Sequence, residues 1–199
     1  MNKILIVGDS FAADWNAKYQ SYPGWPQLLA RHFAIHNLAQ AGCSEYRILQ
    51  QLTTVDINHY RWVIVSHTSP DRIYVPQHPV HSTDILHHHC DLIYTDIEHH
   101  ANLWRNWFNR KLQTAKNYFR YYYSEEYQRY IYSCVRDDIQ RQVDTIPTIH
   151  INNFPSTQHY SKTLDFVALR QEHPGLINHL SAQGNCLVYK EILKVMGHD

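Results

Sequence analysis

The stretch Lys3-Ile-Leu-Ile-Val7, which runs directly into Gly8-Asp9-Ser10, decides the fold class of this chain. A continuous run of β-branched and other apolar side chains is typical of a strand that is buried on both faces of a parallel sheet. The glycine and the two small polar residues that follow indicate a turn. The stretch therefore predicts a parallel strand buried on both faces, with a serine just beyond its carboxyl end.

The segments that follow alternate between helix and strand. Residues 25–34 read as a helix, residues 34–38 as a short strand, the segment after Ser44 as a second helix, and residues 62–65 as a third strand. Such alternation predicts a parallel sheet with helices on both faces, and right-handed crossovers fix its topology. We expect an α/β protein with three flavodoxin-like layers.

The middle of the chain departs from this pattern. Prolines, a histidine-rich stretch from His78 to His100, and many aromatic residues precede a long amphipathic segment that begins near Ser124 and ends before Pro147. We expect a single domain over residues 1–199, with a helical insertion at about 78–145. A strand at 147–151 and a final helix at 181–195 complete the expected fold.

Composition excludes several classes of protein. The chain of 199 residues has 18 Lys and Arg against 18 Asp and Glu, so its formal net charge is zero. It lacks the excess of basic residues that is typical of a nucleic-acid-binding protein, and no apolar run approaches the roughly 20 residues of a membrane span. No secretory signal is evident, and the four cysteines form no CxxC pair. We expect a cytoplasmic protein with free thiols and no nucleic-acid or membrane partner.

Small and polar residues follow three of the expected strands, at Gly8-Asp9-Ser10, Ala41-Gly42 and Ser66-His67-Thr68. In open parallel sheets, ligands bind at the edge formed by the carboxyl ends of the strands. A serine there, with backbone N–H groups of Ser10 and Gly42, provides a nucleophile and two donors for an oxyanion. His179, just ahead of the last helix, is the candidate base that activates the serine.

Four segments resemble the SGNH, or GDSL-type, hydrolases. They are Ile6-Val7-Gly8-Asp9-Ser10-Phe11, Trp25-Pro26-Gln27-Leu28-Leu29-Ala30, Asn37-Leu38-Ala39-Gln40-Ala41-Gly42-Cys43-Ser44 and His179-Leu180-Ser181-Ala182-Gln183-Gly184-Asn185. The resemblance covers about residues 1–70 and 145–199. It implies that Ser10 is the nucleophile, that His179 is the general base, and that the backbone of Ser10 and Gly42 donates to the oxyanion.

Two positions depart from the family pattern. Thr68 stands where the family usually has an oxyanion-binding Asn, and losing such a donor costs about 3–4 kcal/mol of transition-state stabilisation. Leu176 stands where the family usually has the acid that orients the histidine. We expect the orienting partner to be a backbone carbonyl, Asn178, or an acid from elsewhere such as Asp165 or Glu172. A purely structural role for the Thr68 hydroxyl is equally open.

Two further features have alternative interpretations. Arg72 either forms a local ion pair with Asp71 or lines the substrate entrance and binds an anionic group. In the histidine-rich stretch, Asp96 and His100 have i, i+4 spacing, but no established metal motif is present. We therefore expect no metal site and no cofactor, and we expect the aromatic insertion to shape a lid or an acyl pocket.

The sequence thus favours a serine esterase that cleaves acyl esters, acetyl esters among them, through an acyl-serine intermediate. Its expected substrate is a small-molecule or carbohydrate ester. The departures at Thr68 and Leu176 leave two alternatives, a weak or inactive binding protein on the same scaffold and a sugar O-acyltransferase. The substrate and the oligomeric state are not determined by the sequence.

Overall fold

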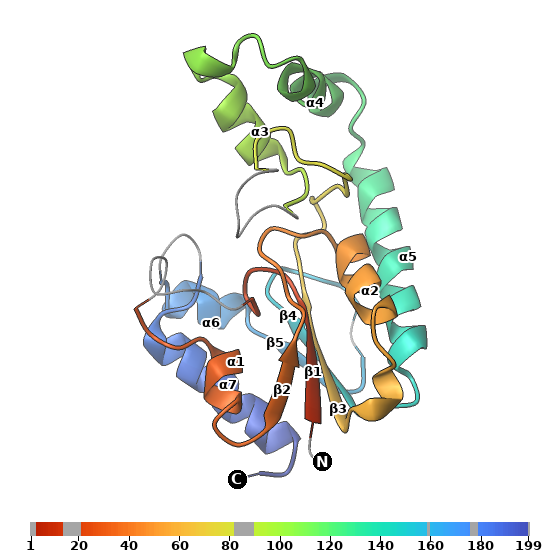
Figure 1. The fold of residues 1–199 in the computed structure, drawn as a ribbon, viewed down its shortest axis with the longest axis vertical. Coiled ribbons are helices and arrows are strands. Elements are labelled where there is room, and N and C mark those ends of the chain that lie inside the picture. Colours follow the sequence, from red (N-terminus) through yellow and green to blue (C-terminus); the bar gives the residue numbers. More distant parts are fainter. Residues whose placement is uncertain (1–2, 14–20, 82–89, 159, 176–178, 199) are drawn as a thin grey trace.

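The computed structural model describes residues 3–13, 21–81, 90–158, 160–175 and 179–198 (Figure 1). Its centre is a five-stranded sheet in the order β2-β1-β3-β4-β5, with every pair parallel. The strands are β1 (Lys3–Gly8), β2 (Ala34–Asn37), β3 (Trp62–His67), β4 (Thr148–Asn152) and β5 (Thr163–Asp165). This order is the flavodoxin-like one, so the predicted fold class is confirmed.

Helices cover both faces of the sheet, as Figure 1 shows. On one face lie α1 (Trp25–Leu29), α6 (Val167–Glu172) and α7 (Ala182–Val195); on the other lie α2 (Glu45–Thr53) and α5 (Glu125–Val143). Alternate residues of β1 serve the two cores, because successive side chains of a strand point to opposite faces. Ile4 and Ile6 pack in the core with α1 and α7, whereas Leu5 and Val7 pack in the core with α2 and α5.

Serine N-caps begin three of the helices where the sequence predicts a helix start. The hydroxyl oxygens of Ser44, Ser124 and Ser181 accept hydrogen bonds from backbone N–H groups in the first turns of α2, α5 and α7. Such caps satisfy donors that have no partner within the helix. The first predicted helix is shorter than expected, since α1 ends at Leu29. No helix among the described residues has the length and apolarity needed to cross a bilayer.

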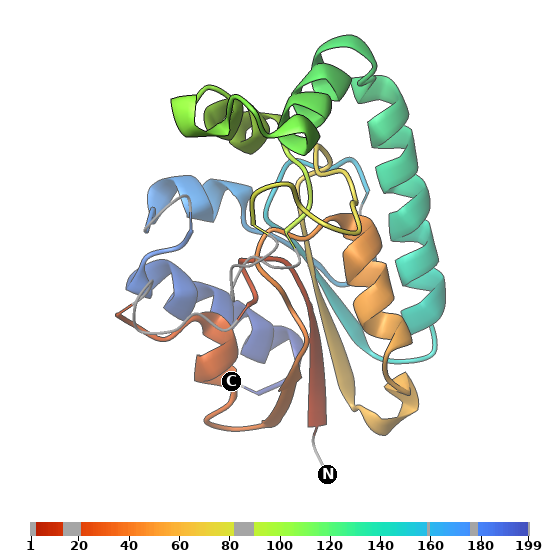
Figure 2. The ribbon, with the colours of Figure 1, turned by 45° about the horizontal axis from the view of Figure 1, so that its top comes forward.

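In the structure, the last helix of the predicted insertion belongs to the α/β core. Helix α5 packs against α2 and the sheet through Val135, Ile139 and Val143, so it is the crossover helix between β3 and β4. Residues 90–123, called the arm here, stand beyond the carboxyl ends of the strands (Figures 1 and 2). The arm contains α3 (Tyr94–Ala101), the short helix η2 (Trp104–Asn106) and α4 (Arg110–Tyr121). It has a small hydrophobic core of its own, made of Leu92, Ile97, Ala101, Leu112, Ala115 and Phe119.

Candidate active site

Ser10 lies in the turn that follows β1, at the edge predicted for a ligand site. The Asp9 carbonyl accepts hydrogen bonds from the N–H groups of Ala12 and Ala13, at 3.1 and 3.0 Å, and these bonds form the turn. Gly8 ends β1 just before this turn, at a point where β1 and β3 approach so closely that a side chain would not fit. A Cβ at Gly8 would lie 2.6 Å from the Cβ of Ser66, closer than two carbons can pack. The glycine of this motif therefore brings the serine turn against the end of β3.

His179 lies beside Ser10, although the two residues come from opposite ends of the chain. Both line one narrow pocket, together with Phe11 and Leu180. The Phe11 ring packs on the His179 ring with a centroid distance of 4.9 Å. The structure thus brings the predicted nucleophile and the predicted base together at the carboxyl edge of the sheet.

The histidine loop is fixed by hydrogen bonds on both sides. The His179 carbonyl accepts a hydrogen bond from Gly175 N–H at 2.7 Å, and the Leu180 carbonyl accepts one from the Tyr22 hydroxyl at 2.8 Å. Asn185, on the first turns of α7, donates from Nδ2 to the Leu180 carbonyl at 3.1 Å and accepts from Trp25 N–H at 3.0 Å. The side chain of Asn185 therefore connects the His179 loop to α1.

Gly42 follows β2 in a left-handed conformation with φ of +72°. A Cβ at this position would lie 2.6 Å from Cys90 Sγ, so only glycine fits. Its carbonyl accepts hydrogen bonds from Arg72 Nη1 at 3.0 Å and from Asp91 N–H at 2.9 Å. These contacts fix the loop that carries the second predicted oxyanion donor.

Thr68 lies just after β3, where its backbone is held by hydrogen bonds but its buried hydroxyl makes none of good geometry. Gly8 of β1 pairs with Ser66 of β3, so Ser10 and Thr68 each follow the paired strand ends. Thr68 is fully buried; its N–H donates to Glu45 Oε2 at 3.3 Å, and its carbonyl accepts from the Tyr132 hydroxyl at 3.0 Å. The Thr68 hydroxyl lies beside the Asp9 carboxyl. Its role as a third oxyanion donor stays a prediction.

Asp9 is a charged group that the sequence interpretation did not single out. The residue is 1% exposed, and its Oδ1 accepts a hydrogen bond from Phe11 N–H at 3.0 Å. Burial raises the pKa of Asp9 to about 7, against the opposing effects of that hydrogen bond and of the positive charge of Arg72. The carboxyl group next to the candidate nucleophile therefore titrates near neutral pH.

The remaining predicted site residues lie in different settings. Arg72 contacts the Gly42 loop, whereas the carboxylate of Asp71 accepts hydrogen bonds from the hydroxyls of Ser69 and Tyr123. Asp165 is exposed at the end of β5, and its Oδ1 accepts the Val167 N–H at 3.0 Å at the start of α6. Asn178 lies outside the described residues. Orientation of His179 by Asp165 or Asn178 therefore stays a prediction.

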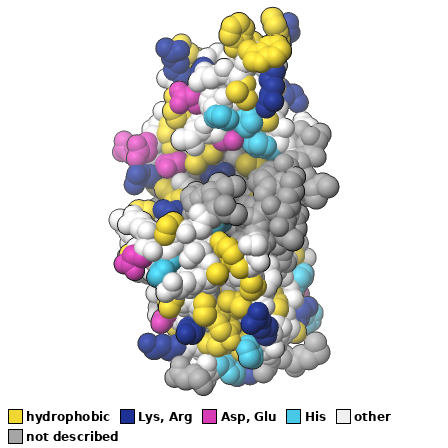
Figure 3. All heavy atoms as spheres, turned by 90° about the vertical axis from the view of Figure 1, so that its left-hand side faces the viewer, with side chains coloured by type: hydrophobic (Ala, Val, Ile, Leu, Met, Phe, Trp, Pro, Cys, Tyr) yellow, Lys and Arg dark blue, Asp and Glu magenta, His cyan; other side chains and the backbone are white. Residues whose placement is uncertain are grey.

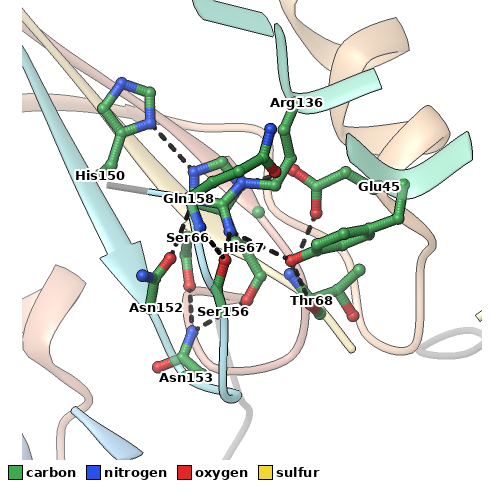
Figure 4. A network of polar contacts seen from close by, with 12 residues as sticks. Glu45, Ser66, His67, Thr68, Arg136, His150, Asn152, Asn153, Ser156 and Gln158 are labelled. Atoms are coloured by element: carbon green, nitrogen blue, oxygen red, sulfur yellow. Dashed lines mark hydrogen bonds and ion pairs between the residues drawn. The ribbon is translucent and has the colours of Figure 1, made fainter. Parts of the chain in front are cut away.

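A buried polar network lies between the sheet and α5, behind Thr68 (Figure 4). His67 Nδ1 lies 2.5 Å from Glu45 Oε1, and His67 Nε2 lies 2.9 Å from His150 Nδ1. Arg136 is fully buried in the same network and donates to Asn152 Oδ1 at 3.0 Å and to Ser156 Oγ at 2.6 Å. Because Glu45 also accepts from Thr68 N–H, the network positions the backbone at the end of β3.

Burial controls protonation in this network. It raises the pKa of Glu45 to about 8, although the Arg136 charge and the hydrogen bond from Thr68 N–H oppose the shift. It lowers the pKa of His67 well below its usual value and that of His150 to about 2, in both cases with help from the Arg136 charge. A neutral Glu45 and two neutral imidazoles therefore accompany the buried guanidinium near neutral pH.

One group among the described residues has the geometry to hold a metal ion, although the sequence predicts none. It consists of His78, His81 and Asp96, at the base of the arm. Only the Asp96–His100 spacing was visible in the sequence.

No protein-family model matches the sequence, and no curated protein sequence matches it. Several solved structures are similar to the chain, and two of them illustrate the likeness. One is a protein assigned to the lipolytic G-D-S-L family from Desulfitobacterium hafniense DCB-2, with 11% identity over 98% of this chain and 99% of that chain and a TM-score of 0.41. The other is an extracellular lipase from Streptomyces rimosus, with 13% identity over 99% of this chain and 75% of that chain and a TM-score of 0.34. Both likenesses are distant, so the roles of the site residues depend on this chain's own geometry.

Proposed function

We propose that this protein is a serine hydrolase of the SGNH type, which cleaves acyl esters through an acyl-serine intermediate. The observation that carries the proposal is the shared pocket of Ser10 and His179, two residues from opposite ends of the chain. A hydroxyl is a weak nucleophile until a neighbouring base accepts its proton. An imidazole held beside a serine at the ligand-binding edge of a parallel sheet meets that need.

The reaction follows from the positions of these groups. Ser10 Oγ attacks the ester carbonyl carbon while His179 accepts the hydroxyl proton. The backbone N–H groups of Ser10 and Gly42 stabilise the resulting oxyanion, and His179 returns the proton to the departing alcohol. Water, deprotonated by His179, then attacks the acyl-serine and releases the acid, with Ser10 regenerated. No cofactor takes part in these steps.

The pocket that Ser10 and His179 line is small. Its free volume is about 10 Å³, room for about one water molecule, and the aromatic ring of Phe11 forms part of its wall. The arm contributes no residue to this lining. The prediction that the aromatic insertion shapes the acyl pocket therefore gains no support, and acetyl esters are the proposed substrates.

A second candidate function is binding without turnover. The hydroxyl of Thr68, which stands in the place of the family's Asn, is buried beside Asp9. If it cannot reach the oxyanion, the site has one donor fewer than the family pattern. A protein that binds acylated ligands and hydrolyses them slowly would fit this arrangement.

Steady-state hydrolysis of p-nitrophenyl acetate and p-nitrophenyl butyrate tests the proposal. We expect turnover of the acetate, slower turnover of the butyrate, and a loss of kcat/KM of at least about 10³-fold in Ser10→Ala and in His179→Ala. Ser161→Ala removes an exposed serine and is the matched control, with the wild-type rate expected. A folded Ser10→Ala protein that retains the wild-type rate would refute the proposal, and a folded wild type without turnover would favour the binding function.

A further inference from the structure

We propose that His78, His81 and Asp96, with His100 beside them, form a binding site for a divalent transition-metal ion, with Zn²⁺ as the best match. The four residues come from two elements that are distant in the sequence. His78 and His81 lie in the turn that precedes the arm, and Asp96 and His100 lie one helical turn apart on α3. Figure 3 shows histidine and acidic side chains together on this part of the surface.

The spacing of the ligand atoms fits a tetrahedral zinc site. His78 Nε2 and His81 Nε2 lie 3.4 and 3.2 Å from Asp96 Oδ2, and His100 Nε2 lies 3.5 Å from Asp96 Oδ1. Zinc binds nitrogen and oxygen ligands at about 2.0–2.2 Å, which places the corners of a tetrahedron about 3.3 Å apart. The ligand atoms of His78, His81 and Asp96 are mutually within 4.8 Å, so small side-chain shifts bring them around one ion.

The buried member of the cluster points to an ion independently of these distances. The His78 side chain is fully buried, and its Nε2 makes no hydrogen bond of good geometry; its polar contact is the Asp96 carboxylate oxygen 3.4 Å away. A buried nitrogen with one long polar contact is poorly satisfied, and a coordinate bond to a metal ion would satisfy it better. Imidazole nitrogens together with a carboxylate are ligands that suit zinc.

The ring orientation of His78 predicts what metal binding changes. Its Nδ1 accepts hydrogen bonds from the N–H groups of Val80 and His81, both at 3.2 Å, so in the metal-free protein Nε2 carries the proton. A metal ion at Nε2 requires that the proton move to Nδ1, and these two hydrogen bonds then break. Metal binding should therefore change the environment of the Val80 and His81 amides.

The position of the site assigns it a structural role. The site lies outside the pocket of Ser10 and His179, and His100, one helical turn from Asp96 on α3, is the nearest further donor that could fill the fourth position of a closed, structural zinc site. The ion would link the turn at 78–81 to α3, beside the small hydrophobic core of the arm. A core of that size gains much from a metal cross-link.

The experiment uses untagged, chelator-treated protein titrated with ZnCl₂. We expect one equivalent to bind, the melting temperature to rise, and the ¹⁵N-amide signals of Val80 and His81 to shift. His81→Ala and Asp96→Asn should each weaken zinc binding at least about 100-fold. His59→Ala is the matched control, because it removes an exposed histidine that pairs with Asp56 at 3.8 Å and lies outside the cluster; its affinity should equal that of the wild type.

Either of two results would refute the proposed metal site. Zinc that binds equally well to the wild type, His81→Ala and Asp96→Asn would be an adventitious ion only. Zinc binding without movement of the Val80 and His81 signals would place the ion elsewhere. Should Asp96→Asn fail to fold, the partly exposed His81→Ala decides the question. The readouts are binding and spectra, so the outcome is independent of any hydrolase activity.

Discussion

Two clusters in the described part of this molecule each combine histidines with one carboxyl group. Their environments give the two carboxyl groups opposite protonation states. In the first, Glu45, His67 and His150 are sealed between the sheet and α5. Burial raises the pKa of Glu45 to about 8 and lowers that of His67 well below normal, so the groups are neutral beside the cation of Arg136. Such a cluster does not attract a second cation.

The second cluster contains His78, His81, Asp96 and His100 at the base of the arm. The Asp96 side chain is 28% exposed. Burial acts to raise the pKa of Asp96, but hydrogen bonds from His78 and His81 outweigh it and hold that pKa below its usual value. An ionised carboxylate among imidazoles, open to solvent, can receive a metal ion. Burial and neighbouring charge, rather than residue type, therefore separate a structural network from a ligand site.

The largest expected difference between the clusters is in stability. Glu45→Ala leaves the His67 ring without its buried hydrogen-bond partner and Thr68 N–H without its acceptor, which should lower the free energy of unfolding by about 3 kcal/mol. Asp96→Ala in metal-free protein leaves the buried His78 Nε2 without its acceptor but otherwise removes partly exposed contacts, so it should cost less, about 1–2 kcal/mol. Urea denaturation of both variants measures the difference. Equal losses would mean that the two environments do not differ as described.

A smaller effect is expected in the pH dependence of stability. Asp9 and Glu45 have pKa values raised from 3.8 to about 7 and from 4.5 to about 8. The folded state therefore binds more protons than the unfolded state between about pH 4 and 8, and these groups lower stability as pH rises through that window. The slope is at most about 1.4 kcal/mol per pH unit for each group.

Glu45→Gln isolates one of these contributions. Its stability relative to the wild type should increase as pH rises from about 4.5 to 8, because the variant cannot ionise there. Denaturant unfolding at several pH values measures this difference. A difference between the two proteins that is constant across the window would contradict the raised pKa of Glu45.

Much of the fold was predictable because local signals and tertiary packing agree. The apolar run at 3–7 forms an interior parallel strand, and helices begin at the serines at 44, 124 and 181, where helix starts were expected. The sequence could not show that α5 belongs to the α/β core and not to the insertion, because an apolar stripe looks the same on an inserted helix and on a crossover helix. Only its packing against α2 distinguishes the two cases.

Functional residues could be predicted where they belong to a recognisable sequence motif. They could not be predicted where the site forms only because folding brings together residues that are distant in the sequence. Ser10 and His179 were selected by sequence and lie in one pocket. The partnership of Glu45 with His67 depends on α2 starting beside the end of β3, which no spacing reveals. The Asp96–His100 spacing was visible, but the turn that supplies His78 and His81 is placed by tertiary structure.

The central claim is that His179 activates Ser10, and intact-mass analysis after treatment with a fluorophosphonate tests it most directly. The account predicts a single adduct on the wild-type protein at Ser10, no adduct on Ser10→Ala, and greatly slowed labelling of His179→Ala. A folded wild type that stays unlabelled, or a Ser10→Ala protein that is labelled at the wild-type rate, would contradict it.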